Sequence, residues 1–241
     1  MSALSTSGAA AGEGVMVCCR VRPLGQGDRG DDRRMLRVLG DGRSLSAEID
    51  AHRRLDFTYG RVFDESATNA DIYTQIGRPL VASALDGIHG SILCYGQTGS
   101  GKTFTMMGRN GIFSEGDDAG LVPRVFTDIF EHVRVADKTA FDFEVRISVI
   151  EIYQDELFDM IPPSATAASS ESAKKKEGST SARQAKINAS KKRIGIYETG
   201  GGAGLSVVGA SSVEVLNAPA ALKVADLALK RRRVAATEMN R

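Results

Sequence analysis

Apolar and polar positions alternate along the first part of the chain in a way that predicts strands followed by a helix. Val15 to Val21 is an apolar, β-branched run that ends before Pro23, which predicts a buried strand. A weaker pair of strands is expected before Phe63. Isoleucine, leucine and alanine then recur at helical spacing, which predicts a helix over 70–88 with a kink at Pro79.

The middle of the chain repeats this order of strand, loop and helix. Ser91 to Tyr95 is expected to be a short apolar strand, followed by a glycine-rich loop over 96–101 and a helix that begins near Lys102. A polar, glycine-rich loop over 108–120 precedes a second helix, with Pro123 in its first turn.

The later elements complete an α/β pattern. Apolar residues alternate over 141–149 and then occupy both faces at Ile150 and Ile152, which predicts a strand that becomes buried on both sides. Structure is expected again at 205–208, and a helix over 219–234. Strands that alternate with helices indicate an α/β sheet flanked by helices.

Two segments lack this apolar rhythm. Residues 1–13 are mostly Ser, Ala and Gly, and we expect a flexible tail. Residues 162–193 hold a Pro-Pro pair, many Ser and Ala, and two clusters of basic residues, with no recurring apolar positions. They are expected to form a mobile surface insertion in an otherwise single domain over 14–241.

Composition excludes several classes of protein. Thirty-one basic and thirty acidic side chains nearly cancel, so bulk charge favours neither nucleic acid nor a membrane surface as a partner. No apolar run approaches the roughly 20 residues that span a bilayer, and no signal peptide is recognisable. The three cysteines have no metal-ligand spacing, and the adjacent Cys18 and Cys19 should face opposite sides of a strand. We expect a cytoplasmic protein.

A glycine-rich loop carries the clearest chemistry. It fits the pattern G-x-x-x-x-G-K-[ST] with Gly96, Gln97, Thr98, Gly99, Ser100, Gly101, Lys102 and Thr103. Glycines let such a loop curl so that N–H groups point at phosphate oxygens, and the following helix adds its positive end. Lys102 can then reach the β- and γ-phosphates, and Thr103 can ligate Mg²⁺. An ordinary glycine-rich turn is the alternative, but the apolar run before it and the helix after it favour a phosphate loop.

The surrounding sequence resembles the motor domain of kinesins. The stretch G-S-I-L-C-Y-G-Q-T-G-S-G-K-T-F-T-M-M-G is similar to the kinesin phosphate-loop signature, with His89 in place of the asparagine that precedes it. Five further blocks resemble kinesin blocks in the same order, at 17–24, 57–63, 120–124, 148–156 and 234–240. Gly60 replaces the usual aspartate of the second block. An unrelated phosphate-loop NTPase would require all five of these matches to be coincidence.

The resemblance implies roles for further residues. Arg20, Arg22 and Pro23 would line the adenine pocket, and Phe104 would stack on the base of ATP. An aromatic face and planar guanidinium groups suit a flat base, although the residues alone would also fit a solvated strand end and a core position. The loop over 108–120 would lie beside the nucleotide, and the loop over 209–218 would touch tubulin.

The same comparison implies a limit on activity. The kinesin pattern continues beyond Asn240 to the switch motifs, the main microtubule-binding helices and the neck linker, so we expect a motor fold that is incomplete at its C-terminus. The implied function is the ATP-binding part of a microtubule motor on the cytoskeleton; the alternative is a nucleotide- or tubulin-binding module without turnover. We also expect the central mixed sheet to be split around 91–95, because strands from the later half would pair there. Subfamily, cargo, direction and oligomeric state leave no signal in the sequence.

Overall fold

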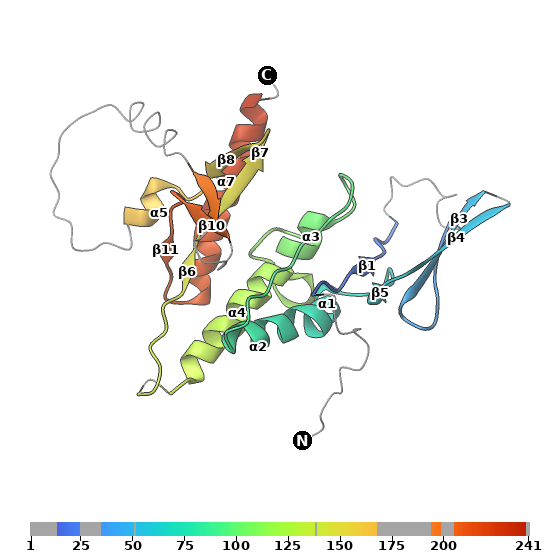
Figure 1. Ribbon diagram of the computed structural model, residues 1–241, viewed down its shortest axis with the longest axis horizontal. Helices are drawn as coiled ribbons and strands as arrows, with labels where there is room; N and C mark the ends of the chain where they lie inside the picture. Colours follow the sequence, from blue (N-terminus) through green and yellow to red (C-terminus); the bar gives the residue numbers. More distant parts are fainter. Residues whose placement is uncertain are drawn as a thin grey trace.

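Several small sheets lie around a group of helices in the computed structural model of the chain (Figure 1). The structure describes residues 14–24, 35–50, 52–137, 139–167, 194–198 and 205–239. Strand β1 (Cys18–Arg20) pairs in parallel with β5 (Arg61–Phe63). An antiparallel sheet contains β2 (Leu36–Val38), β3 (Ser44–Asp50) and β4 (Arg53–Thr58).

Three more sheets are antiparallel pairs. Their members are β6 (Arg146–Ile147) with β11 (Val213–Glu214), β7 (Ile150–Tyr153) with β8 (Glu156–Asp159), and β9 (Gly195–Glu198) with β10 (Leu205–Val208). Within the described residues the strands therefore form five separate sheets.

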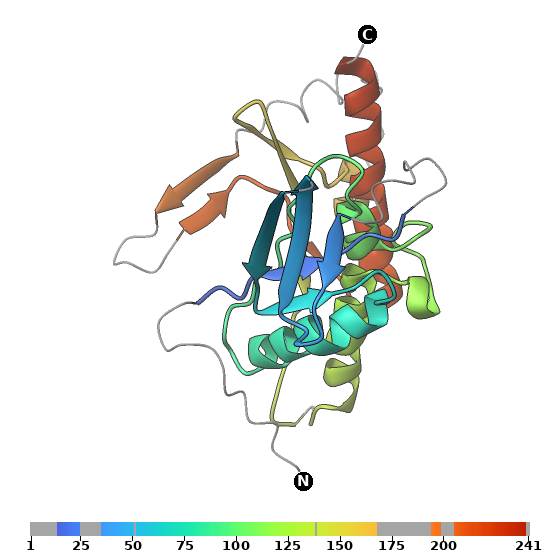
Figure 2. The same ribbon diagram turned by 90° about the vertical axis from the view of Figure 1, so that its right-hand side faces the viewer.

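Helices occupy the centre and one end of the molecule. They are α1 (Asn69–Ile72), the π-helix η2 (Tyr73–Gly77), α2 (Arg78–Leu85), α3 (Lys102–Met107), the 3₁₀-helix η3 (Gly116–Asp118), α4 (Leu121–Val135), α5 (Pro163–Ala167) and α7 (Ala218–Met239). Helix α4 packs against α2, α3 and α7. Figures 1 and 2 show α1 to α4 between the β2–β4 sheet and α7.

The helix predicted over 70–88 is confirmed, running from Asn69 to Leu85 in three parts. Thr68 caps it, since its side chain accepts from the Asp71 N–H while the Asp71 carboxylate accepts from the Thr68 N–H. Pro79 lies in the first turn of α2 and lacks the backbone N–H that would donate to a carbonyl of the preceding turn. The chain widens there into a π-helix, in which Arg78 N–H donates to Tyr73 O.

The core consists of three clusters rather than one. Cys18 packs against the cluster that contains Phe63, Ile72 and Leu121, whereas Cys19 packs against a separate one around Leu45. The adjacent cysteines therefore do face opposite sides of β1, as the strand period requires. Burial raises the pKa of both thiols. The third cluster joins β6, β11, α5 and α7.

Two predicted strands differ from the structure. Only 18–20 of the run 15–21 forms a strand, and Val15 and Val17 are exposed. Ser91–Tyr95 is not a strand, because the backbone over 89–95 forms no hydrogen bond with other backbone groups in the described part of the chain. The sheet is thus split at this segment, as expected.

The segment 91–95 still has the alternating burial of a strand. Ile92 and Cys94 are half-buried, while Leu93 and Tyr95 are 90% and 98% exposed. Ile92 also lines a cavity of ≈ 420 Å³, together with apolar side chains of α3, α4, β6 and α7. One face of the segment is therefore covered and the other presents apolar side chains to solvent.

The strand predicted over 141–152 is divided. Phe141 and Phe143, at the start of the predicted strand, lie outside any strand and are 62% and 38% exposed. The observed strands β6 and β7 cover only 146–147 and 150–153. The register shows why. Ile147 pairs with Val213 of β11, whereas Ile150 pairs with Asp159 of β8, so the two halves join different sheets.

The predicted surface insertion over 162–193 is wrong at its beginning. Pro163–Ala167 form α5, and Ala165 is 8% exposed within the core cluster of β6, β11 and α7. Small residues such as alanine carry little apolar surface, but they fit into a core at places where elements pack closely together. The remaining part, 168–193, and the predicted tail over 1–13 lie outside the described residues.

Candidate nucleotide-binding site

The loop before α3 needs glycine at both of its ends. Gly96 has φ = 155°, and a Cβ atom there would lie 2.5 Å from Ser100 Oγ, so a side chain at this position would strain the backbone and displace the serine. Gly101 is the N-cap of α3 and has φ = 99°, in the left-handed region. The helix begins at Lys102, as predicted. Between these ends Gln97, Thr98 and Gly99 are exposed, so the tip of the loop is accessible to a ligand.

The Lys102 side chain folds back over this loop. Its Nζ donates to Gly96 O at 2.7 Å and to Gln97 O at 2.8 Å. The ammonium is therefore held at the loop, where phosphate oxygens would compete with the two carbonyls for its three N–H donors. The next residue, Thr103, is exposed.

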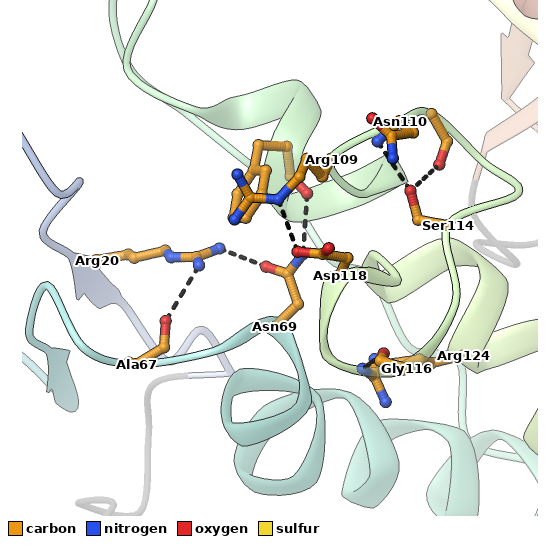
Figure 3. Close-up of polar contacts among 11 residues, drawn as sticks. Arg20, Ala67, Asn69, Arg109, Asn110, Ser114, Gly116, Asp118 and Arg124 are labelled. Carbon is orange, nitrogen blue, oxygen red and sulfur yellow. Dashed lines mark hydrogen bonds and ion pairs between the residues drawn. The ribbon is translucent and has the colours of Figure 1, made fainter. Parts of the chain in front are cut away.

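Arg20 reaches from the end of β1 to the start of α1. Its Nη1 donates to Thr105 Oγ1 at 2.8 Å. Nη1 also donates to Asn69 Oδ1 at 2.6 Å, and Nη2 donates to Ala67 O at 3.2 Å (Figure 3). Burial lowers the pKa of this guanidinium, but the three acceptors compensate the buried charge. Asn69 is fully buried, and its Nδ2 donates to Phe104 O at 3.1 Å.

The half-buried Phe104 ring lies beside this network. The Arg20 guanidinium carbon is 5.0 Å from the ring centroid, and that of Arg109 is 5.7 Å away. The exposed Arg22 lies next to the loop, with its Cδ 4.0 Å from where a Cβ on Gly101 would stand. Pro23 follows Arg22 and is exposed. The structure thus places Arg20, Arg22 and Phe104 around the start of α3.

The loop over 108–120 is closed at its base. Gly108 and Ala119 form a β-bridge, and Arg109 N–H donates to Asp118 O at 3.2 Å. The Arg109 Nε also donates to Asp118 Oδ1 at 2.8 Å. Arg124 of α4 supports the far side through Ala119 O and Gly116 O. The loop therefore has a closed base and continues directly into α4 (Figure 3).

The comparison with known families gives the assignment. The kinesin motor domain model matches residues 20–241. The chain belongs to the kinesin motor domain family. The loop 96–103, Arg20 and Phe104 all lie within the matched region, and the α/β fold follows from the same match.

Relatives and a solved structure agree with this assignment. The chain is 31% identical over 228 residues to the kinesin-like protein KIN-1 of Oryza sativa subsp. japonica, a match that covers 94% of this chain and 42% of that protein. It is 38% identical over 154 residues to the kinesin-like protein KIN-14M of Arabidopsis thaliana, covering 61% and 20%. A solved structure of a fast kinesin superposes with a TM-score of 0.73 at 26% identity, covering 94% of this chain and 55% of that one. The chain therefore spans less than half the length of the two curated relatives and about half of the solved kinesin chain.

The sequence analysis does not predict several residues that the structure places beside this candidate site. Asn69 was a usable candidate, because the capping pair Thr68 and Asp71 places it at the first position of α1. Thr105 lies two residues after the loop 96–103. Its contact with Arg20 depends on the packing of β1 beside α3, which the local sequence does not show. No sequence pattern predicts the ion pair of Arg109 with Asp118, because this pair forms only when the loop over 108–120 closes at its base.

The remaining predictions concern residues away from the loop 96–103. The loop over 209–218 contains β11, and Val213 and Val215 are each 3% exposed, so part of it belongs to the core. The described residues hold no group of three or more His, Cys, Asp or Glu side chains suited to a metal ion. No helix among them is long and apolar enough to cross a membrane.

Proposed function

We propose that this chain binds ATP with Mg²⁺ at the loop 96–103, and that it is the nucleotide-binding part of a motor that moves along microtubules. The solved fast kinesin is described by its ATPase mechanism and its interactions with microtubules. Family membership extends the same activity to this chain as a proposal. ATP is the ligand, tubulin is the partner, and the cytoskeleton is the expected location.

The Lys102 contacts carry the phosphate part of the proposal. The ammonium is held by Gly96 O and Gln97 O at the start of the glycine loop, 2.7 and 2.8 Å away. A triphosphate would offer charged acceptors in place of these neutral carbonyls, and charge-assisted hydrogen bonds are roughly twice as strong. The lysine is therefore positioned for phosphate without a large rearrangement of its stem.

Residues around α3 support the base and metal parts. Arg20, Arg22, Pro23 and Phe104 would form the adenine side, where the aromatic ring supplies a stacking surface. Thr103 would be the protein ligand of Mg²⁺, with the phosphates as its other anionic ligands.

Binding and turnover are tested separately. Isothermal titration of the chain with Mg-ATP is expected to give binding that Lys102→Ala abolishes, while Thr103→Ala mainly weakens the dependence on Mg²⁺. Lys223→Ala removes an exposed lysine of α7 and serves as the matched control. Unchanged ATP binding in the Lys102 variant would refute the site. Phosphate release with microtubules, measured on the chain with and without its natural downstream sequence, then distinguishes a motor ATPase from a nucleotide- or tubulin-binding module without turnover.

A further inference from the structure

A second arginine lies against the ring that is proposed to stack on the base. Arg109 has its guanidinium carbon 5.7 Å from the Phe104 centroid, within the range of a cation–π interaction. It comes from the loop over 108–120, not from the strand that supplies Arg20. None of the residues assigned to the base by family resemblance comes from this loop.

The side chains of Arg20 and Arg109 differ in how firmly hydrogen bonds hold them. Arg20 is fixed by three acceptors on Ala67, Asn69 and Thr105. The Arg109 side chain is 64% exposed, and its ion pair with Asp118 uses Nε. Within the described residues both Nη groups of Arg109 remain available as donors. A base that stacks on Phe104 can therefore shift Arg109 more easily than Arg20.

We propose that Arg109 is a specificity-determining residue of the nucleotide site, which contacts the purine stacked on Phe104 and donates to an acceptor nitrogen of the base. This inference rests on the proposed nucleotide function. The chemistry fits, because a guanidinium stacks on flat π-systems and donates in a planar fork, and purine rings carry acceptor nitrogens. Asp118 orients the guanidinium through Nε and leaves the Nη groups free to turn toward the ligand.

The same contact connects the base to α4. Arg109 is anchored by its backbone to Asp118, and the loop ends at Gly120, where a Cβ would lie 2.4 Å from Met106 O. The end of α3, the base of the loop and the start of α4 are thus packed without spare room. Movement of Arg109 on nucleotide binding would therefore be transmitted to the loop over 108–120.

The test compares a ligand that has a base with one that has none. Mg-ADP and Mg-tripolyphosphate are titrated into the full chain by calorimetry. Arg109→Ala is expected to raise the Kd for ADP about two- to five-fold, the size of an exposed cation–π contact, and to change the Kd for tripolyphosphate by less. Arg109→Lys keeps the charge but loses the planar fork, and should weaken ADP binding while leaving tripolyphosphate unchanged.

Controls separate base recognition from charge and folding. Arg134→Ala removes an equally exposed arginine from an ion pair on α4 and should change neither Kd. Hydrogen exchange over 108–120 should slow with ADP but not with tripolyphosphate, and Arg109→Ala should remove that difference. Equal weakening of both ligands, or tighter ADP binding by Arg109→Ala, would overturn the proposal. If neither ligand binds the unaltered chain, the proposed nucleotide function fails and this inference with it; if both bind and only the ADP difference is missing, this inference alone fails.

Discussion

Arg20 donates to Asn69 across 2.6 Å, which joins the end of β1 to the first residue of α1. The same Asn69 donates to the carbonyl of Phe104. One buried amide therefore connects a strand, a helix and the residue that is proposed to stack on the base. Asn69 is fully buried, so water cannot reach its side-chain amide in the folded state. These two hydrogen bonds therefore satisfy the amide in place of water.

Asn69→Ala should destabilise the fold. The change leaves the half-buried Arg20 guanidinium with fewer acceptors and removes the donor to Phe104 O, which should cost about 1–3 kcal/mol of unfolding free energy. Urea denaturation monitored by circular dichroism measures this loss. Asn110→Ala, in the exposed part of the loop over 108–120, should be nearly neutral. Equal stability of the two variants would show that the Arg20–Asn69 contact does not hold these elements together.

Tyr73 should make stability sensitive to alkaline pH. Burial, with a hydrogen bond of 2.7 Å from Tyr73 Oη to Asp128, raises the pKa of this phenol above its usual range. A raised pKa in the folded state stabilises the fold below the unfolded value of about 10, and this contribution is lost as the pH rises further.

The Tyr73→Phe variant tests that sign. It should lose about 0.5–1.5 kcal/mol at pH 7.5 through the missing hydrogen bond, yet its stability should fall less steeply above pH 10 than that of the parent. Urea unfolding across this pH range gives both slopes. Tyr95→Phe, at a side chain that is 98% exposed, is the matched control and should follow the parent. Parallel slopes for Tyr73→Phe and the parent would contradict the prediction.

The exposed face of 91–95 should drive self-association. Leu93 and Tyr95 present apolar surface from a segment whose backbone makes no backbone hydrogen bond within the described part of the chain. Replacing both with lysine should shift the chain toward monomer in sedimentation velocity, and should change stability by less than about 0.5 kcal/mol because neither side chain is buried. Ile92→Lys should instead destabilise the fold, since Ile92 packs against the Phe63 cluster. Unchanged sedimentation of the double variant would rule out this face as the cause of association.

The region after Pro162 should divide into a structural and a dispensable part. Ala165→Asp places a charge within the cluster of β6, β11 and α7 and should destabilise the fold by a few kcal/mol, roughly the cost of burying an unpaired polar group. Replacing 170–190 with a short Gly-Ser linker should leave the melting temperature unchanged, because that sequence has few apolar residues. A large drop in melting temperature for the linker variant would show that 170–190 is structural.

Local sequence determined the features whose contacts lie within a few residues. The glycine loop, the start of α3 at Lys102, the helical run from Asn69 to Leu85 and the first turn of α4 all follow from motif, capping and spacing. A helix forms its hydrogen bonds within its own segment, so its pattern is sufficient to predict it. The order of the motifs along the chain is also sufficient to indicate the kinesin family without any tertiary contact.

Only the tertiary structure decided the rest. The Arg20–Asn69 contact spans 49 positions and the Asn69–Phe104 contact 35, so no local pattern contains them. Residues 91–95 have the composition and alternation of a strand, yet a strand obtains its hydrogen bonds from neighbours, and the described residues supply none there. Ala165 likewise became a core residue through helix packing that its own segment does not encode. Non-local pairing, rather than propensity, is the physical reason for each difference.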